Sequence, residues 1–253
     1  MTWLDAVGRG LDRAGAPVTV FFRDDDAGWA DERLETLLDV FARHGAPIDL
    51  AVIPEALDAP LAARLRDRRA AAGGLVGLHQ HGLSHRNHEV EGRKCEFGPS
   101  RPPGVQRADI EHGRRLLADL LGPDLDPIFT PPWNRCTPDT GAALAELGLV
   151  LSRDATAAPL GIAALRELPI AIDWFAHRKG ERIARAELGE RIAERLGAPG
   201  PVGIMLHHAV MEHEDMSGTE ELVALLAGHP AASLRTMGSL ASEGDGRKEE
   251  PGT

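Results

Sequence analysis

Pro17-Val-Thr-Val-Phe-Phe-Arg23 is a run of β-branched and aromatic residues that leads directly into three adjacent carboxylates, Asp24, Asp25 and Asp26. Such a run predicts a buried strand, because these side chains suit the pleated backbone of a sheet. The stretch 31–44 follows with apolar residues at helical spacing. The two segments together predict a strand and a helix, with the carboxylates at the carboxyl end of the strand.

The same alternation continues along the chain. Short apolar runs are followed by amphipathic stretches rich in Ala, Leu, Arg and Glu, which is typical of β-α units around a parallel sheet. Because seven or eight such units fit a closed sheet better than an open one, we expect a distorted (β/α) barrel of about seven strands. The further expected strands are 48–53, 75–78, 127–129, 149–152, 167–172, 202–206 and 233–236, and the further expected helices are 61–71, 108–121, 138–147, 184–196 and 218–227.

Length and charge limit the classes of function. The 253 residues suffice for one large core, so we expect one domain over 1–241 and a disordered polar tail over 242–253. The net charge of −11 is spread along the chain without a basic cluster, which argues against nucleic acid as a partner. No apolar run is long enough for a membrane span or an export signal. With only Cys95 and Cys136 as cysteines, we expect both to stay reduced in a cytoplasmic protein, and a secreted protein with one disulfide is the alternative. The oligomeric state is not indicated.

Reactive residues gather where the expected strands end, which is where a β/α barrel places its chemistry. Three adjacent carboxylates repel one another unless a cation compensates them, so the acidic run indicates a cation nearby. The competing interpretation is a solvated turn in which one aspartate caps the next helix. The four clusters are 24–26 after the first strand, 79–88 after the third, 130–135 after the fourth, and His207 with His208 after a late strand.

His81-Gly-Leu-Ser-His85 directly follows an expected strand. Two histidines at this spacing can bind one ion if the segment makes a turn, and a carboxylate from the first strand can complete the site. Two imidazoles and one carboxylate leave a position open on a zinc-like ion, as in catalytic sites. The neighbouring His79 and His88 are candidates for further ligands or for partners of the ligands, but we expect ordinary core or surface positions for each.

The acidic run followed by His-x-x-Ser-His resembles the polysaccharide deacetylase (NodB-homology) family of carbohydrate esterases, and the resemblance extends from about Val18 to His208. It implies that Asp25 is the base and Asp26 a metal ligand, with Asp24 and Asp25 as the alternative pair. The same resemblance makes His81 and His85 the other two ligands.

Three later motifs extend the resemblance. The stretch 130–134, Thr-Pro-Pro-Trp-Asn, is similar to the Arg-Pro-Pro-Tyr-Gly of the family, with Thr130 in place of an arginine that pairs with the base. Arg23 and Arg135 are the residues that can take over its role. The resemblance also implies that Asp173 orients the general acid, and that His207 is this acid, with His208 as the competitor. The residues implied to contact substrate are Trp133, Pro132, Leu206 and Arg23, although Trp133 and the two prolines have an equally good structural explanation.

The long polar loop 86–106 is expected to shape the substrate cleft, because long loops in compact domains are usually functional. Its charged residues either meet polar groups of the substrate or remain solvated on the surface. These residues are Glu91, Arg93, Lys94, Glu96 and Arg101.

Together these features predict a hydrolase that uses a divalent metal, expected to be zinc, to remove an acetyl group from an N-acylated sugar. A small sugar derivative or a lipid-linked sugar is the expected substrate. One alternative is a hydrolase of another amide or ester with the same site. The other is a barrel that binds metal or carbohydrate without turnover, and the arginine missing at Thr130 favours it.

Overall fold

The computed structural model describes residues 2–243, and its centre is a curled parallel sheet. Seven strands follow one another in the order β5-β4-β3-β2-β1-β9-β6. Their bounds are β1 Val18–Ala27, β2 Ile48–Val52, β3 Val76–His81, β4 Ile128–Thr130, β5 Val150–Leu151, β6 Ile170–Asp173 and β9 Val202–Leu206, and β10 (Ala232–Leu234) pairs with the start of β1.

The two edges of this sheet meet through the segment between β5 and β6. The N–H of Leu168 donates to the carbonyl of Leu151 at 2.9 Å, and the N–H of Ile170 donates to that of Arg153 at 2.8 Å. Short bridges of this kind close the sheet without a full strand ladder. The predicted distorted barrel of about seven strands is therefore confirmed.

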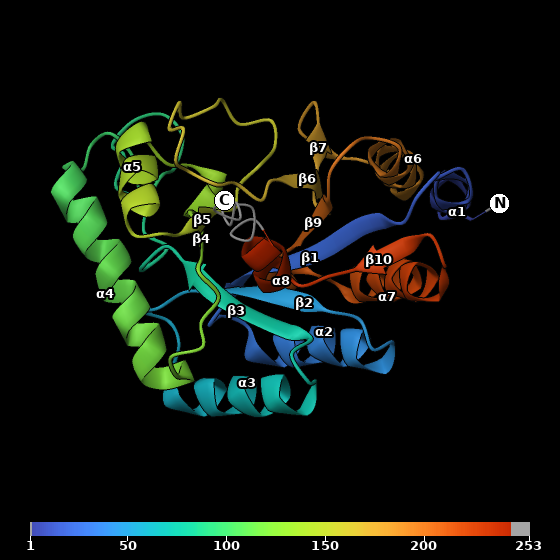
Figure 1. The fold of residues 1–253 in the computed structure, drawn as a ribbon, viewed down its shortest axis with the longest axis horizontal. Coiled ribbons are helices and arrows are strands. Elements are labelled where there is room, and N and C mark those ends of the chain that lie inside the picture. Colours follow the sequence, from blue (N-terminus) through green and yellow to red (C-terminus); the bar gives the residue numbers. More distant parts are fainter. Residues whose placement is uncertain (1, 244–253) are drawn as a thin grey trace, which may run out of the picture.

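Helices surround the sheet, and α8 lies near the middle of the ring that they form (Figure 1). The helices are α1 Asp5–Asp12, α2 Asp31–Arg43, α3 Ala59–Ala71, α4 Pro103–Leu121, α5 Pro138–Glu146, α6 Arg185–Leu196, α7 His213–Gly228 and α8 Met237–Glu243. A small hairpin of β7 (His177–Arg178) and β8 (Glu181–Arg182) follows β6, and two short 3-10 turns are η1 (Pro132–Asn134) and η2 (His208–Val210).

Side chains of the strands alternate between two cores. On β1, Phe22 faces outward into the large cluster between the sheet and the helices, whereas Phe21 faces into the barrel. Met205 of β9 and Met237 of α8 belong to the same inner cluster as Phe21, so α8 packs into the amino-terminal end of the barrel. This alternation sends every second residue of β1, up to Asp25, into the barrel.

Most differences from the expected elements lie at their ends. β3 continues to His81, so the first histidine of the predicted pair lies within the strand. The first helix, α1, and the hairpin of β7 and β8 were not predicted. Of the expected tail, Ser242 and Glu243 are the last residues of α8, and 244–253 lie outside the described residues. Within residues 2–243, no helix is both long and apolar enough to cross a membrane.

Candidate active site

The acidic run at the end of β1 is not a solvated turn. Asp24 and Asp25 are buried, and α2 begins after Ala30 without a side-chain cap. Asp26 follows in a left-handed backbone conformation with φ of 72°, which interrupts the alternation of the strand. Each of the three carboxylates has its own partner, so the compensation expected from the sequence is present.

Asp26 meets the two predicted histidines. Its Oδ1 lies 3.2 Å from Nε2 of His81 and 3.2 Å from Nε2 of His85. The three potential ligand atoms lie within 4.8 Å of one another, as a site for one ion requires. Burial opposes ionisation of Asp26, but hydrogen bonds from the two histidines outweigh it and lower the pKa of the carboxyl. Asp26 is therefore a carboxylate at neutral pH, able to bind a cation.

The main chain of β4 orients His81. Nδ1 of His81 lies 3.0 Å from the carbonyl oxygen of Thr130, which can only accept a hydrogen bond. Nδ1 therefore carries a proton, and Nε2 is the nitrogen available to an ion. Ligating histidines in metalloproteins are commonly fixed by such a hydrogen bond on the other nitrogen. The donor set and its support fit a divalent ion such as zinc.

Asp25 forms a buried bidentate ion pair with Arg23 of the same strand. Nε of Arg23 lies 2.7 Å from Oδ1, and NH2 lies 2.8 Å from Oδ2. Burial alone would raise the pKa of Asp25, but the charge of Arg23, aided by His81 and His207, lowers it. Asp25 is therefore a carboxylate able to accept a proton.

Arg23 forms the ion pair with Asp25 that the resemblance would give to the arginine missing at Thr130. NH1 donates to Ser152 Oγ at 2.9 Å, and NH2 donates to Asn134 Oδ1 at 2.8 Å, so the guanidinium is held from two further segments. Arg135, the other candidate, donates instead to the carbonyl of Lys94. Because Arg23 is fully buried, it does not fit its expected contact with substrate.

Thr130 forms a neutral contact in place of the expected ion pair. Its Oγ1 lies 3.0 Å from Nε2 of His79, a fully buried residue of β3. Burial, with the charge of Arg23 nearby, lowers the pKa of His79 to about 3. His79 is therefore a neutral core histidine, which agrees with its ordinary interpretation.

The two adjacent histidines after β9 point in different directions. Nε2 of His207 lies 3.9 Å from Oδ2 of Asp25, and its side chain is partly exposed. His208 is buried, with Nδ1 at 2.6 Å from Oδ2 of Asp24. The structure thus brings His207 close to Asp25. His208 instead pairs with Asp24, the first carboxylate of the acidic run.

Of the other residues expected at the site, Asp173 and Leu206 make other contacts, whereas Pro132 and Trp133 lie beside the histidine turn. Oδ1 of Asp173 accepts the N–H of Phe175 at 2.8 Å, and among residues 2–243 it makes no hydrogen bond or ion pair with His207. Leu206 is buried in the outer core, which does not fit its expected contact with substrate. Pro132 is buried beside Gly82, where it supports the histidine turn, while Trp133 is partly exposed with its ring 4.5 Å from that of His85.

Glu96, which was expected to meet substrate or to remain on the surface, instead supports the histidine turn from inside the protein. It is fully buried, and its Oε1 accepts the N–H of Ser84 at 2.8 Å and the hydroxyl of Ser84 at 2.9 Å. These bonds hold the turn between His81 and His85. Of the other charged residues expected to meet substrate, Arg101 pairs with Asp109, and Glu91, Arg93 and Lys94 are exposed.

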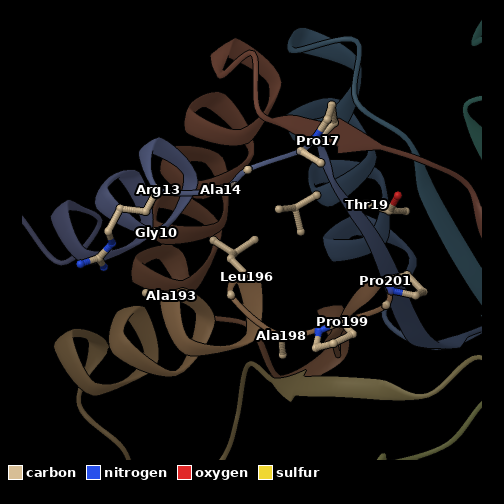
Figure 2. A pocket seen from close by; sticks show the side chains of 15 residues that line it. Gly10, Arg13, Ala14, Pro17, Thr19, Ala193, Leu196, Ala198, Pro199 and Pro201 are labelled. Carbon is tan, nitrogen blue, oxygen red and sulfur yellow. The ribbon is translucent and has the colours of Figure 1, made fainter.

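A cavity of about 610 Å³ lies away from these residues, between α1, the start of β1 and the end of α6 (Figure 2). Its lining consists mainly of small and apolar residues, with Arg13 as the charged one. It opens at the amino-terminal end of the strands, opposite the carboxylates and histidines. The cavity therefore offers no reactive group to a substrate.

Comparison with known proteins identifies the fold. A scan against known protein families and a search of curated proteins each return no match. Among solved structures, a protein from Mycobacterium smegmatis assigned as a polysaccharide deacetylase aligns over 95% of this chain and 94% of its own, with TM-score 0.68 and 17% identity. A family 4 acetyl xylan esterase from Clostridium thermocellum, in complex with a cobalt ion, aligns over 89% and 91%, with TM-score 0.59 and 15% identity.

One of the similar structures is described as a pseudoenzyme. It is a family 4 carbohydrate esterase pseudoenzyme from Bacillus anthracis, which aligns over 90% of this chain and 66% of its own, with TM-score 0.58 and 11% identity. The fold therefore occurs both with and without catalysis, and function has to be argued from the site. The chain has the curled parallel barrel of polysaccharide deacetylases and family 4 carbohydrate esterases.

Proposed function

We propose that this protein is a metal-dependent hydrolase that removes an acetyl group from an N-acylated sugar. The observation that carries the proposal is the convergence of Asp26, His81 and His85 next to an ionised carboxylate, Asp25, that binds none of them. A divalent ion held by this set, which we propose to be zinc, would polarise the scissile carbonyl and make water acidic enough to attack.

Asp25 is the proposed base. Its carboxylate is kept ionised by Arg23, and the guanidinium occupies both carboxylate oxygens from one side. The other side is left to the water that attacks the carbonyl, whose proton Asp25 accepts. Since Arg23 is itself bonded to Ser152 and Asn134, the base is held in one orientation before substrate binds.

His207 is the proposed acid. It approaches Asp25 from β9 on the exposed side of the site, where the leaving nitrogen of an amide substrate can reach it. The amine leaves only when it receives a proton, and a positioned imidazolium supplies it. Asp25 and His207 thus handle the two proton transfers that hydrolysis of an amide requires.

One residue, Arg23, favours the proposal over the non-catalytic alternative. A missing counter-ion for the base was the feature that favoured loss of turnover, and Arg23 supplies that counter-ion from a different strand. Hydrolysis of another amide or ester with the same residues remains the second candidate, because the barrel itself does not select the acyl group.

The metal site is tested by the metal content of purified protein, measured by mass spectrometry, in the parent and in His81→Ala and His85→Ala. We expect about one ion per chain in the parent and a sharp loss in both variants, because removal of one of three protein ligands leaves the ion poorly held. His88→Ala is the matched control, since His88 lies in the same loop outside the cluster. Stoichiometric metal in both ligand variants would exclude the site.

Turnover is tested by acetate release from N-acetylglucosamine oligomers and from trifluoroethyl acetate, an activated ester. In His207→Gln we expect a much larger loss with the amide than with the ester, because the alkoxide of the ester leaves without a proton from the protein. Equal losses would contradict the role of His207. Protein that binds metal and hydrolyses neither substrate would support the non-catalytic alternative.

A further inference from the structure

Trp29 lies beside the proposed metal ligands in the loop between β1 and α2. It is 41% exposed, and its ring centroid is 4.8 Å from that of His85. The ring of Trp133 contacts the same imidazole at 4.5 Å. The His85 ring is therefore in contact with two indoles, and Trp29 keeps a large apolar surface open to solvent at the edge of the site.

The backbone of Trp29 is fixed on both sides. Its N–H donates to the carbonyl of Asp26 at 3.1 Å, which closes the turn that carries the ligand. Its carbonyl accepts a hydrogen bond of 2.7 Å from Nε2 of His208. Exposed aromatic side chains on loops are commonly mobile. The backbone of Trp29, in contrast, is hydrogen-bonded to Asp26 and His208 of the barrel.

His208 is in turn fixed by Asp24. Nδ1 lies 2.6 Å from Oδ2, and the backbone N–H of His208 donates to Oδ1 at 2.9 Å. Both ring nitrogens face groups that only accept, a carboxylate and a carbonyl, so both nitrogens carry hydrogen. The pair is an imidazolium and a carboxylate, both fully buried. Nothing in the proposed reaction uses either residue.

We infer that Trp29 is a substrate-binding residue on which the apolar face of the sugar ring stacks, and that the buried Asp24–His208 pair positions it. The inference rests on the proposed function, because the sugar is the substrate of that site. A rigid indole loses little conformational entropy when a ligand binds, so fixing its backbone raises the affinity of the site. Aromatic side chains are also the usual apolar lining of ligand sites.

The first test is Trp29→Ala, with Trp29→Phe as the conservative variant. For N-acetylglucosamine trimer we expect Trp29→Ala to raise KM about tenfold, with a smaller effect on kcat, and Trp29→Phe to restore most of the affinity. The loss with trifluoroethyl acetate, which has no ring, should be smaller. Leu75→Ala is the control, since Leu75 is exposed at the opposite end of the barrel and should leave both substrates unaffected.

The second test is a double-mutant cycle of His208→Leu and Trp29→Ala. If the buried pair acts through Trp29, His208→Leu alone should raise KM for the trimer, and it should raise KM little further in the Trp29→Ala background. Asp24→Asn provides an independent version of the same cycle. Fully additive losses in KM would show that the pair does not act through Trp29, and would overturn that part of the inference.

Calorimetric titration with the trimer separates this inference from the proposed function. If the parent turns over neither substrate, the proposed function fails, whereas binding of the trimer to the parent and to Trp29→Ala still decides the role of Trp29. Binding at least about tenfold weaker in Trp29→Ala supports the inference. Equal binding of the trimer by the two proteins overturns it.

Discussion

The two ends of the barrel both bury carboxylates, and they treat them in opposite ways. At the carboxyl end, Asp25 lies against Arg23 at 2.7 Å, and its pKa is lowered although burial opposes this. At the amino end, Asp49 of β2 is equally buried. Its Oδ2 accepts the N–H of Met237 at 2.8 Å, and within residues 2–243 its Oδ1 has no hydrogen-bond partner. Burial, with the nearby charge of Asp126, raises the pKa of Asp49 well above its ordinary value.

The neighbouring carboxyl of Asp126 also has no cation in close contact. Its Oδ2 accepts the N–H of Leu78 at 2.9 Å, and the nearest guanidinium nitrogen, from Arg69, is 3.9 Å from its Oδ1. Burial therefore also raises the pKa of Asp126. The comparison indicates that a cation beside a buried aspartate lowers the pKa of its carboxyl, whereas burial raises that pKa where the close partners are mainly N–H donors.

Asp25→Asn should have the largest effect. Loss of the proposed base is expected to lower kcat by roughly 10²–10⁴-fold, the usual contribution of a positioned base, while bound metal stays near one ion per chain. Steady-state kinetics and metal analysis on the same preparation measure both quantities.

Asp49→Asn is the matched control, because it makes the same chemical change at the other end of the barrel. We expect it to leave kcat within about twofold of the parent. The backbone of Asp49 pairs with that of Arg23, but its side chain accepts a hydrogen bond from Met237 of α8 and none from a residue of the proposed site. If Asp24→Asn loses turnover as Asp25→Asn was expected to, while Asp25→Asn remains active, the base is Asp24 and the comparison of the two ends has to be redrawn.

Glu96→Gln should have an intermediate effect, and it tests whether a buried carboxylate can act by support alone. The amide keeps one acceptor for the turn at Ser84, but it places N–H groups where the carboxylate accepted hydrogen bonds. We expect the dissociation constant of the metal to rise by roughly ten- to a hundredfold, as for other residues that orient ligands. Competition with a chromogenic chelator measures it.

Glu89→Gln is the control for this variant. Glu89 lies in the same loop and also accepts two hydrogen bonds from a serine, Ser100, but it contacts no residue of the histidine turn. Metal affinity should be unchanged in Glu89→Gln. Equal affinities in the parent and in Glu96→Gln would mean that the turn is held without Glu96.

Asp49→Asn should have the smallest effect, seen in stability rather than in turnover. Unfolded Asp49 loses its proton near pH 3.9, whereas the folded residue keeps it to a higher pH. Within that window the unfolded state binds fewer protons, so the free energy of unfolding falls as pH rises, by up to about 1.4 kcal/mol per pH unit. Asparagine has no proton to lose, so this contribution disappears.

Urea unfolding at about pH 5 and about pH 8 measures the difference. The free energy of unfolding of Asp49→Asn minus that of the parent should become more positive at the higher pH, because only the parent loses stability as the pH rises. A difference that is the same at both pH values would show that Asp49 is already ionised in the folded protein at pH 5. The buried aspartates Asp25 and Asp49 would then both be ionised, and the two ends of the barrel would not differ in this respect.

The sequence predicts the barrel and the convergence of Asp26, His81 and His85, because both follow from the order of apolar runs and reactive residues along the chain. Each reactive group follows an apolar run, and the carboxyl ends of parallel strands meet at one edge. The assignment of Leu206 could have been corrected from the sequence as well. A residue next to His207 on a strand faces the opposite side, so both cannot line the same cleft.

Other features depend on tertiary contacts that leave no local signal. Glu96 lies in a polar loop that is similar in composition to solvated surface, and only the fold places it under Ser84. Asp173 follows the family motif in sequence, yet the backbone after β6 turns its carboxylate to Phe175. Trp29 is a single aromatic residue in a short loop, and its importance appears only with its hydrogen bond to His208.

The proposed base and its counter-ion occupy one strand, two residues apart, and this has a mechanical consequence. Small shifts of one strand relative to its neighbour change the length of side-chain contacts between the two strands more than the length of contacts within one strand. Arg23 and Asp25 are separated by one residue of the same strand, and the backbone of Arg23 and Asp24 is paired with β2 on one side and β9 on the other. Shifts that disturb Asn134 or Ser152 should therefore change the separation of Asp25 and the guanidinium less than they change contacts between strands, so the largest favourable contribution to the ionised state of Asp25 is local to β1.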